Sequence, residues 1–180
     1  MGNKFGGYEM RSSKIAKLAS VVLVGSCIGI AGAQTSGASG LSVRAGWFWP
    51  SSTEATDLGN NWFGLGLDYK LNTLSAKAPV VGTQAYFGIS ADYYSRGGDN
   101  DLPVALTYNI KQSGFLFSAG IGPDFVNAGD ITGNSVGISE QVGVGYDILP
   151  GPVPVFIQAK YYFASKPELS GLGVYLGVRF

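Results

Sequence analysis

The ten residues Gly171-Leu-Gly-Val-Tyr-Leu-Gly-Val-Arg-Phe180 decide the fold of this chain. Side chains alternate between the two faces of a β-strand, so every second residue of this stretch shares a face. One face carries glycine, tyrosine and arginine. The other carries only apolar residues, namely Leu172, Val174, Leu176, Val178 and Phe180. The stretch therefore predicts a strand between an apolar and a polar environment.

Seven earlier segments repeat this alternation, and each is close to the roughly 9–11 residues that a tilted membrane-spanning strand needs. The predicted strands are 41–49, 62–71, 81–94, 102–111, 115–125, 136–148, 153–163 and 171–180. An even number of antiparallel strands closes a barrel with both chain ends on the same side. The sequence thus predicts an all-β fold, an eight-stranded antiparallel up-and-down transmembrane β-barrel over residues 41–180.

Glu140 breaks the alternation of the segment 136–148, because it stands between Ile138 and Val142 on the apolar face. It would face lipid unless a β-bulge or a place at the rim displaces it. Its placement stays open on the sequence alone.

The composition agrees with a barrel in lipid. The chain is 46% hydrophobic and 13% charged with 28 glycines, whereas soluble domains carry about 25% charged residues. A formal net charge of zero gives no reason to expect nucleic acid as a partner. The one cysteine, Cys27, falls in the segment that we expect to be removed, so we expect no disulfide and no thiol chemistry. The acidic loop residues form no calcium-loop spacing, and we predict no metal site and no cofactor.

The first 33 residues have the features of a secretory signal peptide. Basic residues precede an apolar run at 18–30, and small residues follow at 31–33. Met10 is a possible true start, and Cys27 offers an alternative lipoprotein site. Residues 34–40 are predicted to form a flexible lead-in to the barrel.

The last strand resembles the C-terminal assembly signal of Gram-negative outer-membrane barrels, which end in phenylalanine with apolar residues at every second position before it. Val174, Leu176, Val178 and Phe180 match this signal position by position. Over residues 41–180 the chain resembles the small eight-stranded barrels of the OmpA/OmpX type. The resemblance implies a monomer in the lipid of the outer membrane of the cell envelope, assembled by machinery that binds the last strand.

The predicted inner face gathers charges of both signs, which in a narrow interior must pair to offset the cost of burial. They are Arg44, Asp68, Lys70, Asp92, Lys111, Asp124, Asp147, Lys160 and Arg179. An eight-stranded barrel is just wide enough for side chains to fill it. We therefore expect a polar, filled interior and a structural or surface role. The alternatives are a narrow porin-like channel for small solutes, or a soluble secreted lipocalin-like carrier with the two faces reversed.

An enzymatic function is not expected from the sequence. Some outer-membrane enzymes are also small barrels, namely phospholipases, lipid A deacylases, palmitoyl transferases and omptin-type proteases. They use a catalytic histidine, and the chain has no histidine. No serine stands in a recognisable nucleophile motif. We therefore predict no catalytic residues.

Overall fold

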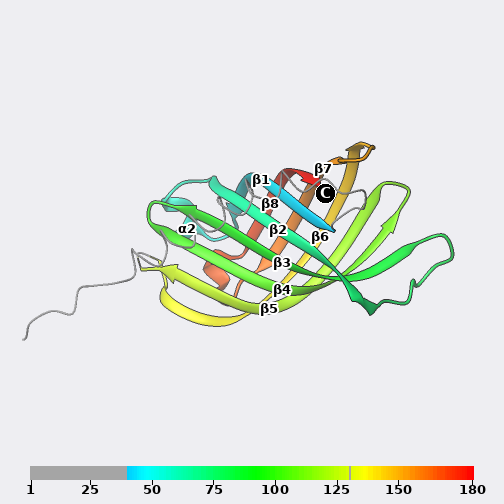
Figure 1. The fold of residues 1–180 in the computed structure, drawn as a ribbon. Helices are drawn as coiled ribbons and strands as arrows, with labels where there is room; N and C mark the ends of the chain where they lie inside the picture. The colour runs from blue at the N-terminus through cyan, green and yellow to red at the C-terminus, as the bar shows by residue number, and fades with distance from the viewer. Residues whose placement is uncertain (1–39, 130) are drawn as a thin grey trace, which may run out of the picture. The chain divides into compact units, whose positions relative to one another are not determined.

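The computed structural model describes residues 40–129 and 131–180, and these form a closed barrel in which each strand pairs with its sequence neighbours (Figure 1). The predicted signal peptide and residues 34–39 of the predicted lead-in lie outside the described residues. The strands are β1 (Leu41–Pro50), β2 (Trp62–Ser75), β3 (Gln84–Arg96), β4 (Asp99–Gln112), β5 (Phe115–Ala128), β6 (Gly133–Leu149), β7 (Val155–Phe163) and β8 (Gly171–Arg179).

The barrel closes between the first and the last strand. β1 pairs antiparallel with β8 from Ser42↔Arg179 to Pro50↔Gly171, and every other neighbouring pair is antiparallel as well. The predicted fold class is therefore confirmed.

The two ends of the barrel differ. We call the end at which Leu41 and Arg179 lie the terminal end; it also carries the connections 76–83, 113–114 and 150–154. The opposite, loop end carries 51–61 with the short helix α2 (Thr53–Asp57), and 164–170 with the 3₁₀ turn η1 (Pro167–Leu169). In the described part of the chain, no helix is long and apolar enough to cross a membrane.

β4 extends beyond the predicted segment 102–111 at both ends, whereas β3 begins three residues later and ends two residues later than the predicted segment 81–94. The two strands meet in a two-residue turn, Gly97-Gly98. Both glycines have positive φ angles, 66° and 113°. A tight turn between twisted antiparallel strands requires this conformation, and glycine adopts it without steric cost.

The outer and inner faces of the wall have opposite chemistry. Large apolar side chains such as Trp47, Phe63 and Leu176 lie on the exterior, where they are 52–58% exposed. Polar and aromatic side chains fill the interior, including Arg44 and Asp92, which are almost fully buried. A lipocalin-like carrier would need the reverse arrangement. The lipocalin-like alternative is therefore wrong.

Glu140 faces outward. The ladder between β5 and β6 runs without a shift from Phe115↔Tyr146 to Ala128↔Gly133, so no bulge displaces the residue. Its cross-strand neighbours are Ile121 and Phe163, which are both exposed on the same apolar surface. One carboxylate thus stands in the apolar outer wall.

Candidate functional site

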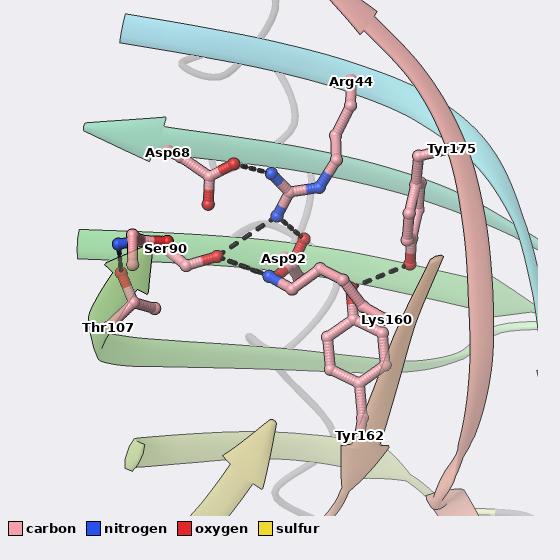
Figure 2. A network of polar contacts seen from close by, with 9 residues as sticks. Arg44, Asp68, Ser90, Asp92, Thr107, Lys160, Tyr162 and Tyr175 are labelled. Carbon is pink, nitrogen blue, oxygen red and sulfur yellow. Dashed lines mark hydrogen bonds and ion pairs between the residues drawn. The ribbon is translucent and has the colours of Figure 1, made fainter. Parts of the chain in front are cut away.

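The interior of the barrel contains two layers of side chains and one cavity. We call Arg44, Asp68, Ser90, Asp92 and Lys160 the charged layer (Figure 2). The aromatic layer, on the loop side of it, consists of Phe48, Trp62, Tyr94, Tyr162 and Tyr175. The vestibule is the cavity of about 240 Å³ at the terminal end.

The register of three strands explains how the charged layer forms. Arg44 on β1 lies opposite Gly66 on β2, and Gly66 lies opposite Asp92 on β3. A side chain at position 66 would run into both the guanidinium of Arg44 and the carboxylate of Asp92. Glycine between them therefore lets the two charged groups meet across an intervening strand.

Asp92 is the centre of the charged layer. Its carboxylate forms ion pairs with Arg44 and with Lys160, whose Nζ lies 2.7 Å from Asp92 Oδ2. Asp92 has no exposed surface, and Arg44 and Lys160 are 3% and 2% exposed. Arg44 also pairs with Asp68. Burial of these charges is costly, and mutual pairing offsets that cost.

Ser90 connects the same groups. Its hydroxyl accepts from Lys160 Nζ at 2.8 Å and from Arg44 at 3.2 Å, and it donates to Asp92 Oδ2 at 2.9 Å. Each lone pair and the proton of the hydroxyl are therefore used. Figure 2 shows these contacts converging from β1, β3 and β7 on one point of the interior.

The aromatic layer closes the barrel on the loop side of the charged layer. Phe48 stacks on Tyr94 with ring centroids 3.9 Å apart, and Tyr94 packs on Tyr162 at 5.4 Å. Tyr162 donates to the hydroxyl of Tyr175 at 3.1 Å. Each ring of the layer is at most 1% exposed. The layer is thus as fully buried as the core of a soluble domain.

The connections at the loop end pack on the aromatic layer. Ala55 from α2 and Leu169 from η1 have no exposed surface. Ser52 caps α2 through the Ala55 amide, and its hydroxyl donates to the carbonyl of Glu168 at 2.8 Å. The two connections therefore hold each other over the mouth of the barrel.

The vestibule is lined by polar and charged residues near the ends of the strands. At its rim, the carboxylate of Asp147 pairs with Lys111 at 2.6 Å and with Arg179 at 2.8 Å. Lys70 is exposed, and its Nζ lies over the ring of Tyr86, 5.2 Å from the centroid.

The structure places the predicted inner charges in three groups. The charged layer brings together Arg44, Asp68, Asp92 and Lys160. The terminal end holds Lys70, Lys111, Asp147 and Arg179. Asp124 lies apart at the loop end, where it accepts from the backbone amide of Ser165 at 2.7 Å.

Asp101 is a buried carboxylate that lies outside the predicted strand 102–111. It has no exposed surface and accepts from the Tyr94 hydroxyl at 2.7 Å. The alternation of 102–111, continued by one residue, would have placed Asp101 on the inner face with Pro103. Trp62 directly precedes Phe63, which faces outward, so alternation also predicts that Trp62 is buried.

The residues of the predicted assembly signal lie on or next to β8. Val174, Leu176 and Val178 alternate outward, and the amide of Phe180 donates to the carbonyl of Leu41 at 2.7 Å. The role of these residues in assembly stays a prediction.

These features define a small eight-stranded barrel with an apolar exterior, the fold of small outer-membrane β-barrels. No protein-family model and no curated protein matches the sequence. The chain is similar to the crystal structure of the outer membrane enzyme PagL, with a TM-score of 0.52 and 17% identity over 77% of this chain and 98% of that one.

Two further solved structures are similar to the chain. The N-terminal β-barrel domain of Pseudomonas aeruginosa OprF has 13% identity and a TM-score of 0.47, over 78% of this chain and 96% of that one. Neisserial surface protein A has 18% identity and a TM-score of 0.43, over 79% of this chain and 97% of that one.

The comparison with PagL corrects the prediction that the chain is not an enzyme. That prediction excluded catalysis because the chain lacks histidine, yet an outer-membrane enzyme has the same fold over nearly its whole length. At 17% identity the likeness carries the fold and assigns no reaction to this chain. The barrel fold is therefore compatible with catalysis and does not establish it.

Proposed function

We propose that this protein is an integral outer-membrane barrel with a filled interior, which serves as a structural or surface element and does not conduct solutes. The observation that carries the proposal is the aromatic layer, in which Phe48, Tyr94 and Tyr162 pack across the lumen without exposed surface. The charged layer lies directly beneath it, and α2 and η1 cover it.

The outer wall supports the membrane location. Its exposed apolar side chains include residues on every strand, such as Trp47, Ile89, Ile121 and Leu172. Such a surface would aggregate in water, whereas lipid accommodates it. In this placement the terminal end faces the periplasm and the loop end faces outward.

Conductance across a planar lipid bilayer tests the closed interior. The purified, refolded barrel should give no steps above the background of the detergent. A matched variant, Tyr94→Gly with Tyr162→Gly, removes two rings of the aromatic layer and should give measurable current if that layer is the barrier. Current through the unaltered protein would contradict the proposal and favour the narrow channel.

Cell fractionation tests the location, and Phe180→Ala tests the assembly partner. We propose that the outer-membrane assembly machinery recognises Phe180 together with the apolar residues before it. The variant should reach the outer membrane in lower yield, while its unfolding midpoint after refolding in detergent stays close to that of the unaltered barrel. Equal outer-membrane yields would refute this role.

A further inference from the structure

The vestibule is lined by more positive than negative side chains. Four cationic side chains line it, whereas Asp68 is the one carboxylate side chain among its described lining residues. The cationic residues are Lys70, Lys111, Lys160 and Arg179.

Ion pairing does not neutralise this excess. Arg44 and Lys160 pair with the carboxylates of Asp68 and Asp92. Lys111 and Arg179 at the rim share the carboxylate of Asp147. The five cations of the charged layer and vestibule thus meet three carboxylates, an excess of two.

Lys70 is the cation of this set that pairs with none of the three carboxylates. It forms no ion pair with any residue that the structure describes, and its Nζ contacts the face of the Tyr86 ring instead. Its side chain is exposed, so it can turn toward a ligand without breaking a buried contact.

The rest of the lining includes neutral residues that can donate hydrogen bonds. Ser42, Gln84, Tyr86 and Asn109 line the cavity and carry hydroxyl or amide groups. A recess with low-dielectric walls and one sign of excess charge concentrates ions of the opposite sign. The volume of about 240 Å³ limits the occupant to a small molecule.

We propose that the vestibule is a binding site for a small oxyanion, a carboxylate or a phosphate, that enters from the terminal end. The charged layer forms its floor, and Lys70, Lys111 and Arg179 at its wall and rim bind the anion. The inference goes beyond the closed barrel proposed above, because a blind recess can bind a solute whether or not the barrel conducts.

Titration of the refolded barrel with inorganic phosphate in a zwitterionic detergent, at constant ionic strength, tests the site. Binding is followed by calorimetry and by NMR shifts of Lys70 and Tyr86. We expect saturable binding in the millimolar range or tighter. Lys70→Gln should weaken it roughly tenfold and Lys70→Glu should abolish it, since one charge-assisted contact is lost or reversed.

Lys166→Gln is the matched control, because it removes the same charge at the loop end, outside the vestibule. It should bind phosphate as the unaltered protein does. Absence of saturable binding, or an equal loss in Lys166→Gln and Lys70→Gln, would overturn the proposal. Since Lys70 is exposed, its variants should retain the heat-resistant folded form, which gel mobility checks. Conductance is measured in a separate experiment, so the proposed anion site and the proposed closed barrel can each fail without the other.

Discussion

The two halves of the barrel interior differ in how they are filled. On the loop side, aromatic rings pack against one another, and the buried carboxylates beside them, Asp101 and Asp124, accept from the Tyr94 hydroxyl and the Ser165 amide. On the terminal side, charges pair around Asp92 and Asp147 and leave a cavity. Aromatic rings pack without regard to charge, whereas a buried charge needs a partner of opposite sign. The terminal half is therefore the half in which single substitutions should cost most and in which a solute can find room.

Asp92→Asn should have the largest effect, because it leaves Arg44 and Lys160 buried without their shared carboxylate. Loss of one partner of a buried ion pair costs about 3–5 kcal/mol. Urea unfolding of the refolded barrel in lipid vesicles measures the change. Asp57→Asn, on the exposed surface of α2, is the control and should change little. Equal stability of the two variants would mean that the charged layer is hydrated rather than buried.

Leu176→Lys should have the next largest effect, because it places a charge on the apolar outer wall. Leu176 is 58% exposed on the outer face of β8. A lysine on the lipid face near the bilayer centre costs about 2–4 kcal/mol, which the same unfolding experiment would detect. An unchanged unfolding midpoint would contradict the assignment of the outer wall to lipid.

Tyr94→Phe tests the aromatic half with a change of one hydroxyl. The ring stacking on Phe48 is kept, and the buried carboxylate of Asp101 loses its 2.7 Å donor. An unsatisfied buried acceptor costs about 1–3 kcal/mol. Tyr146→Phe removes a hydroxyl from the outer wall and serves as the control. A loss as large as that of Asp92→Asn would show that the loop half also depends on polar pairing.

Glu140→Leu should have the smallest effect and the opposite sign. The carboxylate stands in the apolar wall beside Ile121 and Phe163, and an acidic residue there is less costly than a basic one. Its replacement should raise the free energy of unfolding by up to about 1 kcal/mol. A lower stability would show that Glu140 has a favourable partner on the outer wall.

The sequence by itself determined the strands, their number and the two faces of the wall. The period of two in side-chain direction is local, so residues 171–180 and the segments that repeat them reveal which side chains share a face. The same rule correctly predicted that Arg44, Asp92 and Lys160 face the interior. It went wrong where a strand continued past its last apolar residue, because Asp101 then lies in a strand rather than in a loop.

Only the tertiary structure decided which inner residues meet. Arg44 reaches Asp92 because Gly66 lies between them in the register of three strands, and Lys160 arrives from the far side of the barrel. The division into an aromatic half and a charged half follows from strand tilt and closure, which place residues distant in sequence at one level. Alternation specifies which side of the wall a side chain is on, but not its level, that is, its position along the barrel axis. The physical reason is that direction is set by each residue's own backbone, whereas level is set by the pairing of all eight strands.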